Sequence, residues 1–155
     1  MWLKFILSGL IIAFCVVLGW LAAEKYRIRK KFFSQLAALN AQYISELTYS
    51  RKPLDVFLEK QNCTPDFAKL LQSVKRHESV SFKGFHLTGE ETADYTEYFS
   101  MLGRGDTASQ RGFFSAKSAI LAEKKLATEK EAKARGELYI KLGLLAGLAF
   151  VILIL

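Results

Sequence analysis

Apolar residues are concentrated at the two ends of this chain, and charged residues lie between them. Residues 5–23 contain no charged side chain, and as a helix they measure about 28 Å, close to the hydrocarbon thickness of a bilayer. Residues 142–155 are also free of charge, and Lys141 just before them can extend toward the head groups. The pattern therefore predicts two transmembrane helices, residues 1–23 and residues 138–155.

A cleaved signal peptide is the alternative interpretation of the first apolar segment, because Lys4 supplies a short basic start. The apolar region of such a peptide is usually about 7–15 residues long, which is shorter than the segment found here. Leu21-Ala22-Ala23 is also a poor match to a small-x-small cleavage site. The sequence therefore favours an uncleaved anchor.

The basic residues beside the two anchors predict the orientation of the chain. They are abundant after the first anchor and before the second, and Glu24 is the only acidic residue among the first group. By the positive-inside rule, residues 24–137 are expected in the cytoplasm and both termini outside. We call the residues expected to face lipid head groups the basic collar; its members are Lys25, Arg27, Arg29, Lys30, Lys31, Arg135 and Lys141.

The formal net charge of +7 does not by itself favour nucleic acid as a partner. The basic residues flank predicted membrane helices and lack interleaved aromatic side chains on which bases would stack. The charge therefore indicates membrane lipid as a partner, and no nucleic acid is expected.

The first half of the cytoplasmic segment predicts three helices. The first anchor continues as a helix to about Ser50, because apolar residues recur at spacings of three and four; they are Phe32, Phe33, Leu36, Leu39, Tyr43, Ile44 and Leu47. A short helix is expected over residues 54–60, with Pro53 in its first turn. A third is expected over residues 65–77, with Thr64 as its hydroxyl cap. Residues 79–87 are expected to form a loop, with a short strand as the alternative.

The second half predicts two more helices. Thr88 and Glu91 have the spacing of a capping box, and Gly103 is suited to close the helix that begins there. Either Asp106 or Thr107 can cap the next helix, and Thr107 with Gln110 fits a second capping box. No proline or turn cluster follows, so this helix is expected to continue into the last membrane span. Its predicted buried face, with the core near residues 113–121, consists of Phe113, Ala116, Ile120, Ala127 and Ala134.

These elements predict an all-α protein, an antiparallel helical bundle flanked by an N-terminal and a C-terminal transmembrane helix. Small residues are also spaced four apart within the apolar ends, where they allow helices to approach closely in lipid. Gly143 and Gly147 form one such pair, and Gly9 and Ala13 form another. The sequence leaves open whether the two spans pack on each other or on another protein.

Residues with the spacing of a catalytic, cofactor or metal site are not evident. The chain has only two histidines, and neither has a cysteine or a second histidine at ligand spacing. Walker, dinucleotide-binding and GxSxG motifs are absent from the sequence. Cys15 lies in a predicted span and Cys63 in the cytoplasmic segment, so a bond between them is not expected. The sequence therefore indicates a protein that is not an enzyme and needs no cofactor.

Several short motifs, in order along nearly the whole chain, resemble the stage III sporulation protein AB family of endospore-forming bacteria. They are Met1-Trp2-Leu3-Lys4, Leu36, Leu39, Glu46-Leu47-Thr48-Tyr49, Pro53-Leu54, Leu102-Gly103, Asp106, Gln110, Tyr139, Leu142-Gly143 and Gly147. Members of that family are similar in their helical domain to the F-type inner-membrane platform proteins of type II secretion and type IV pilus machines. The resemblance implies that six of these residues are family-motif positions or part of a partner surface, although capping alone also accounts for the last three: Glu46, Tyr49, Pro53, Gly103, Asp106 and Gln110.

The resemblance implies a multi-pass membrane platform in the mother cell, in the membrane that faces the engulfed forespore. It further implies a role in a channel or secretion-like complex, with a cytoplasmic secretion-type ATPase and other membrane components as partners. Self-association is left open. The rival interpretation is a membrane-tethered adaptor that binds anionic lipid and recruits a partner protein without transmitting force.

Overall fold

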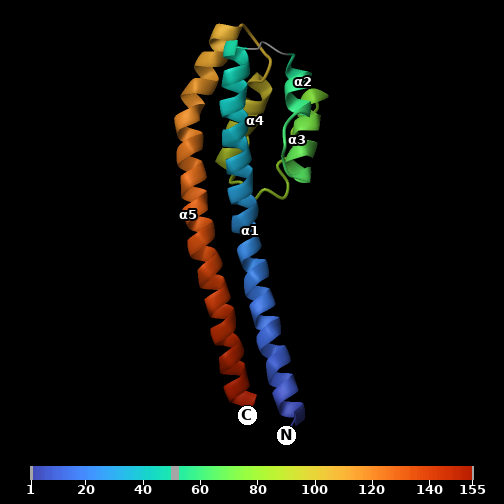
Figure 1. Ribbon diagram of the computed structural model, residues 1–155, viewed down its shortest axis with the longest axis vertical. Coiled ribbons are helices and arrows are strands. Elements are labelled where there is room, and N and C mark those ends of the chain that lie inside the picture. The colour runs from blue at the N-terminus through green and yellow to red at the C-terminus, as the bar shows by residue number, and fades with distance from the viewer. Residues whose placement is uncertain (1, 50–52, 155) are drawn as a thin grey trace. The chain divides into compact units, whose positions relative to one another are not determined.

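The chain forms five α-helices and no strand over residues 2–49 and 53–154, which the computed structural model describes (Figure 1). The helices are α1 (Trp2–Tyr49), α2 (Leu54–Glu59), α3 (Pro65–Lys75), α4 (Gly89–Met101) and α5 (Thr107–Ile154). The all-α prediction is confirmed, and so is the continuation of each apolar end into the charged middle as one unbroken helix. Ser50, where the first helix is predicted to end, lies outside the described residues.

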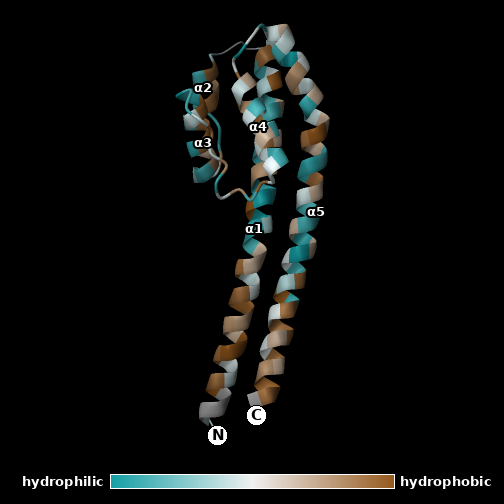
Figure 2. Cartoon of the chain, turned by 180° about the vertical axis from the view of Figure 1, so that it is seen from behind, coloured by the Kyte–Doolittle hydropathy of each residue, from teal (hydrophilic) through white to brown (hydrophobic). Residues whose placement is uncertain are grey.

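The structure divides into two compact units. The terminal unit contains Met1–Lys30 and Ala127–Leu155, and the central unit contains Lys31–Leu126. The end segments of α1 and α5 are predominantly hydrophobic (Figure 2), and both helices are long and apolar enough to cross a membrane. These units reflect packing and not the bilayer, so the predicted domains 1–23, 24–137 and 138–155 stay predictions.

An aromatic cluster centred on Phe32 of α1 forms the core of the central unit. The ring centroids of five aromatic residues lie 4.9–6.2 Å from that of Phe32, namely Phe33, Phe67, Phe82, Phe85 and Tyr95. Such aromatic pairs contribute beyond the area that they bury. Phe82 and Phe85 come from the segment between α3 and α4, so the predicted loop is confirmed and is anchored by two buried rings.

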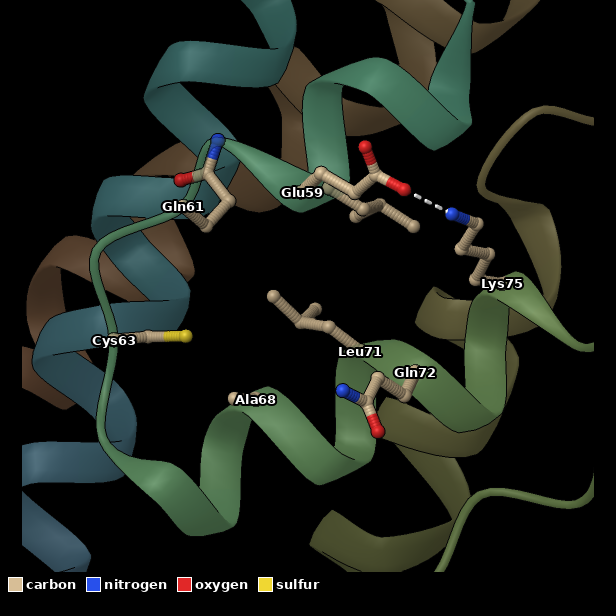
Figure 3. A pocket seen from close by; sticks show the side chains of 8 residues that line it. Glu59, Gln61, Cys63, Ala68, Leu71, Gln72 and Lys75 are labelled. Carbon is tan, nitrogen blue, oxygen red and sulfur yellow. Dashed lines mark hydrogen bonds and ion pairs between the residues drawn. The ribbon is translucent and has the colours of Figure 1, made fainter.

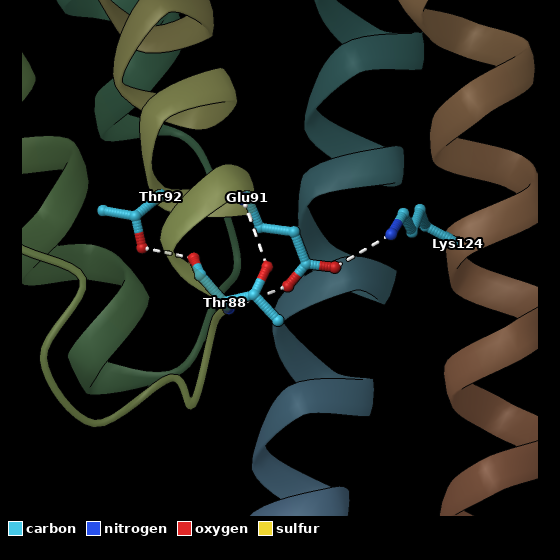
Figure 4. A network of polar contacts seen from close by, with 4 residues as sticks. All are labelled: Thr88, Glu91, Thr92 and Lys124. Atoms are coloured by element: carbon cyan, nitrogen blue, oxygen red, sulfur yellow. Dashed lines mark hydrogen bonds and ion pairs between the residues drawn. The ribbon is translucent and has the colours of Figure 1, made fainter.

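The predicted capping box at the start of α4 is confirmed. The backbone N–H of Glu91 donates to the Thr88 hydroxyl oxygen at 3.3 Å, and the Thr88 N–H donates to the Glu91 carboxylate at 3.1 Å (Figure 4). Thr64 occupies the cap position of α3, but its hydroxyl donates to Gln35 Oε1 at 3.1 Å. Thr64 is therefore the cap residue as predicted, but its hydroxyl makes no capping hydrogen bond with the first turn of α3 and bonds instead to a side chain of α1.

The ends of two helices, α2 and α3, differ from the sequence prediction. Pro53 precedes α2 as its cap residue instead of lying in the first turn, and α2 ends at Glu59. The third helix ends at Lys75, two residues early, because His77 adopts a left-handed backbone with φ of 55°. The His77 N–H then donates to the carbonyl of Val74 at 3.1 Å, which closes the helix as glycine often does.

The buried face of α5 differs from the predicted one by one helical position. Phe114 and Leu121 are fully buried or nearly so, whereas Ile120 is 49% exposed and Phe113 is half-buried. Ala116, Ala127 and Ala134, which the prediction also placed on the buried face, are exposed. The prediction was wrong because polar residues share the true face: Gln110 and Thr128 are buried, and a search for apolar positions passes over both.

Candidate functional site

Hydrogen bonds converge on the Tyr43 hydroxyl where α1 meets the turn between α4 and α5. Tyr43 donates to Oε1 of Gln110 on α5, and it accepts from the backbone N–H of Gly103 at 3.1 Å. The Nε2 of Gln110 donates to the carbonyl of Gly105 at 3.3 Å. One phenol and one amide thereby fix the turn against both long helices.

A second buried polar contact lies one turn earlier on α1. The Nδ2 of Asn40 donates to the carbonyl of Phe114 at 3.1 Å, and the Tyr98 hydroxyl donates to Oδ1 of Asn40 at 3.0 Å. Asn40 and Tyr98 are 1% and 0% exposed. Asn40 therefore links α1 to α4 and to α5 by hydrogen bonds that are shielded from water.

Both phenols in this network act as neutral hydrogen-bond donors. Burial raises the pKa of Tyr43, although the N–H of Gly103 partly opposes that shift. Burial also raises the pKa of Tyr98, and its neighbours Tyr43 and Tyr95 add to the effect. Since the ordinary pKa of tyrosine is already about 10, neither group releases a proton near neutral pH. The network therefore serves to hold geometry.

The turn itself is built from a glycine and an aspartate. Gly103 has a left-handed backbone with φ of +74°, and a Cβ on it would lie 2.8 Å from Cδ2 of Leu54. Asp106 caps α5, because its Oδ2 accepts the N–H of Ser109 at 3.2 Å. Hydrogen bonds from the Ser109 side chain and backbone hold the pKa of Asp106 below its usual range. Of the two caps predicted for this helix, Asp106 is confirmed.

The predicted second capping box is wrong. It paired Thr107 with Gln110, but the Gln110 side chain turns inward to Tyr43 and Gly105. The Gln110 side chain bonds to Tyr43 instead of capping α5, because a buried Tyr43 hydroxyl without a partner would cost about 1–3 kcal/mol.

Beside the turn lies a cavity of about 250 Å³. Three of the six family-motif residues line it: Glu46, Gly103 and Gln110. The remaining lining residues are Tyr43, Leu47, Leu54, Phe57 and Thr107. We call this cavity and its rim the turn site.

The other three family-motif residues lie next to those that line the cavity. Pro53 directly precedes Leu54, Asp106 starts the turn of α5 that contains Gln110, and Tyr49 is the last described residue of α1. Tyr49 is 84% exposed, so it is free to meet a partner. Residues scattered from 46 to 110 in sequence are thus gathered around one turn.

A second cavity of about 190 Å³ lies between α2 and α3 and contains the thiol of Cys63 (Figure 3). Glu59 of α2 and Lys75 of α3 form an ion pair across it. Burial raises the pKa of the Cys63 thiol, which lowers the fraction of reactive thiolate near neutral pH. The environment of Cys63 is therefore the opposite of that of an activated nucleophile.

The buried carboxylate of Glu91 joins α4 to α5. Besides capping α4, it accepts a hydrogen bond from Nζ of Lys124 at 2.9 Å, and its side chain is only 8% exposed (Figure 4). Its position between two helices indicates a structural role.

The small residues of the terminal unit lie where two helical segments touch. A Cβ on Gly19 would lie 2.5 Å from the carbonyl oxygen of Tyr139, and one on Gly143 would lie 2.6 Å from that of Cys15. A Cβ on Gly147 would lie 3.1 Å from Cα of Ile12. The two segments therefore pack on each other, in opposite sequence order, with glycine at the points of closest approach.

The pair predicted on the first helix does not take part in this contact. No described atom lies within 4 Å of a Cβ built on Gly9, and Ala13 is exposed. Gly19 and Cys15 occupy the contact face of α1 instead, and Gly143 and Gly147 lie opposite them as a small-xxx-small pair. Gly143 and Gly147 therefore lie in the contact between the two segments, whereas packing of Gly9 and Ala13 against another protein stays a prediction.

The residues of the basic collar have different surroundings. Arg27 pairs with Glu24 at 3.6 Å and lies over the Trp20 ring, with 5.3 Å between its Cζ and the ring centroid. Lys141 pairs with Glu137 at 4.0 Å. Lys30 and Lys31 are exposed, and Arg29 is half-buried. Lys25 and Arg135 both approach the ring of Tyr26, an aromatic residue that the sequence analysis did not single out.

Among the described residues, no group of three or more His, Cys, Asp or Glu side chains is placed to hold a metal ion. Comparisons with protein-family models, with curated proteins and with solved structures each found no match.

Proposed function

We propose that this chain is a non-catalytic membrane platform component of a sporulation-specific channel or secretion-like complex between mother cell and forespore. In this proposal the terminal helices cross the mother-cell membrane, the helical part forms an antiparallel bundle in the cytoplasm, and a secretion-type ATPase docks on that bundle. The observation that carries the proposal is the turn site. Residues quoted for the family resemblance, far apart in sequence, meet there around one cavity.

The continuity of the two long helices supports a mechanical role. Both α1 and α5 run unbroken through the central and the terminal unit, so no loop separates the turn site from either apolar end. A helix carries displacement along its axis better than a flexible linker does, because its backbone is held by hydrogen bonds within the segment. ATPase movement at the turn site would thereby reach the membrane.

The proposal is tested with the tagged full-length chain, expressed at its native level in a sporulating bacterium and crosslinked in the living cell. Mass spectrometry then measures the secretion-type ATPase that purifies with it. Tyr49→Ala removes an exposed aromatic side chain at the turn site and is expected to reduce recovery of the ATPase several-fold. Leu126→Ala removes another exposed apolar side chain, on α5 and away from the turn site, and recovery should stay unchanged.

The proposal fails if the ATPase is recovered equally from cells that lack this chain, or if deletion of the gene leaves sporulation normal. Binding to anionic vesicles alone, lost at high salt and with no ATPase recovered, would favour the adaptor that recruits a partner without transmitting force.

A further inference from the structure

Two cations from different helices converge on one tyrosine in the terminal unit. The Nζ of Lys25 lies 4.9 Å, and the guanidinium carbon of Arg135 6.0 Å, from the ring centroid of Tyr26. The ring of Tyr139 stacks on that of Tyr26 with 6.0 Å between centroids and 23° between planes. Two positive groups and two phenols are thus brought together from α1 and α5.

The nearby carboxylates are engaged elsewhere or exposed. Glu24 pairs with Arg27, Glu137 pairs with Lys141, and Glu131 is exposed. The Tyr139 hydroxyl, followed by the charges of Lys25 and Arg135, holds the pKa of Tyr26 below its ordinary value. The hydrogen bond from Tyr139 is the largest cause, and the charges of Lys25 and Arg135 add a positive local potential that favours an anion.

Exposed apolar surface adjoins this cluster along both helices. Leu21 is 55% exposed on α1, and Leu138 and Leu142 are 45% and 50% exposed on α5. Trp20, 46% exposed, lies one and a half turns before Tyr26, and the amphipathic rings of tryptophan and tyrosine typically lie at head-group level. Polar donors beside an exposed apolar surface match a ligand with an anionic head and acyl chains.

We propose that Lys25, Tyr26, Arg135 and Tyr139 form a binding site for the phosphate of one anionic phospholipid. Arginine binds phosphate oxygens in a bidentate manner, lysine adds a point charge, and the phenols donate hydrogen bonds. Phosphatidylglycerol suits the site better than phosphatidylcholine, whose quaternary ammonium group the two cations would repel. This proposal rests on the membrane placement of the terminal helices that the proposed function requires.

The test measures lipid retained by the purified full-length chain in detergent, by native mass spectrometry after addition of phosphatidylglycerol or phosphatidylcholine. The site variant is Lys25→Gln with Arg135→Gln. The control variant is Lys130→Gln with Lys133→Gln, which removes the same charge from exposed positions outside the basic collar. We expect one phosphatidylglycerol to be retained preferentially, with affinity reduced about tenfold in the site variant and changed less than twofold in the control.

Tyr26→Phe with Tyr139→Phe provides a second variant that keeps the rings and both charges. It should weaken retention several-fold while the helix content measured by circular dichroism stays unchanged. Inorganic phosphate at millimolar concentration should not compete, because it cannot use the apolar surface. Full competition by phosphate would overturn the lipid as the occupant in favour of a general anion site.

Two other results would overturn the proposal: equal retention of both lipids, and equal losses in the site and control variants, which would indicate diffuse attraction to basic residues in general. The assay contains no ATPase, so a failure of the platform proposal leaves its outcome unaffected. Release of the chain from membranes by an alkaline carbonate wash would instead refute the membrane placement on which both proposals depend.

Discussion

Gly103 occupies a position in the turn where both the backbone and the surroundings exclude a side chain. Its φ of +74° is strained for any residue with a Cβ, and Leu54 fills the space that the Cβ would need. Gly103→Ala is therefore expected to lower the free energy of unfolding by about 1–3 kcal/mol. Thermal unfolding of the full-length chain in detergent micelles, followed by circular dichroism, measures the change.

Gly105 offers a matched control two residues later. Its φ of +86° imposes a similar backbone cost, but no described atom lies within 4 Å of its Cβ position. Gly105→Ala should therefore destabilise the protein less than Gly103→Ala. Equal effects of the two substitutions would show that the contact with Leu54 relaxes without cost.

Asn40 pairs with two buried polar atoms, the carbonyl of Phe114 and the hydroxyl of Tyr98. Asn40→Leu deletes the acceptor of the Tyr98 hydroxyl, which has no access to water because Tyr98 is fully buried. We expect a loss of about 1–3 kcal/mol in the free energy of unfolding. Denaturant unfolding of the full-length chain in mild detergent provides the measurement.

Tyr98→Phe tests the reason for that loss. If the unpaired hydroxyl causes the destabilisation, Asn40→Leu combined with Tyr98→Phe should be less damaging than the sum of the two single changes. Additive effects would show that the two side chains contribute independently and that the hydrogen bond between them adds no stability.

The contact between the end segments of α1 and α5 makes a specific prediction at the level of elements. A Cβ built on Gly147 lies 3.5 Å from Cβ of Cys15, within the range of about 3.5–4.5 Å that disulfides require. With Cys63→Ser in the background, Gly147→Cys should form a disulfide with Cys15 under mild oxidation. The closed chain should migrate faster on a non-reducing gel.

Ala149→Cys is the control for that crosslink. Ala149 is exposed and lies two residues from Gly147, on another side of the helix. It should leave the chain in the open form under the same oxidation. A disulfide formed as readily at position 149 would mean that the two segments do not hold the register seen here.

The sequence predicted helix ends well where the deciding contact is local. The pairing of Thr88 with Glu91 and the capping of α5 by Asp106 involve residues three apart, so their spacing is enough to identify them. The capping hydrogen bonds predicted for Thr64 and Gln110 are not formed, and their side chains bond instead to the distant partners Gln35 and Tyr43. Local rules do not include such long-range competition.

Helix faces were harder to predict than helix ends. The adjacent Phe113 and Phe114 offer two nearly equivalent registers for α5, and polar Gln110 and Thr128 on the true face conceal the correct one. The roles of Gly103 and Asp106 in the turn could be predicted from turn chemistry, whereas the inward role of Gln110 could not. Asn40 and Tyr98 could not, because their contact joins residues 58 positions apart.

At the level of the whole molecule, each of the two long helices consists of an uncharged apolar part and a charged part. In α1 the apolar segment precedes the residues of the basic collar, and in α5 the apolar segment follows them. Moving several lysine and arginine side chains through a bilayer is far more costly than leaving them on one side. One chemical feature therefore predicts both the anchoring and the orientation of the chain.

Labelling of Cys63 tests that orientation in the intact cell. In a Cys15→Ser variant, Cys63 is the only thiol of the chain. If residues 24–137 are cytoplasmic, a membrane-impermeant maleimide should label Cys63 only after the membrane is permeabilised. The reaction is best run at about pH 8, because burial raises the pKa of this thiol and slows its reaction at lower pH.

Trp2→Cys, made with both native cysteines replaced by serine, tests the side of the membrane on which the N-terminus lies. Residue 2 precedes the first apolar segment and is 86% exposed in the structure, so it should be labelled in intact cells if the N-terminus is outside. Labelling of Cys63 without permeabilisation, together with protection of position 2, would reverse the orientation. Labelling of both positions in intact cells would mean that no bilayer separates them, because the two ends of a membrane-spanning helix lie on opposite sides of the membrane.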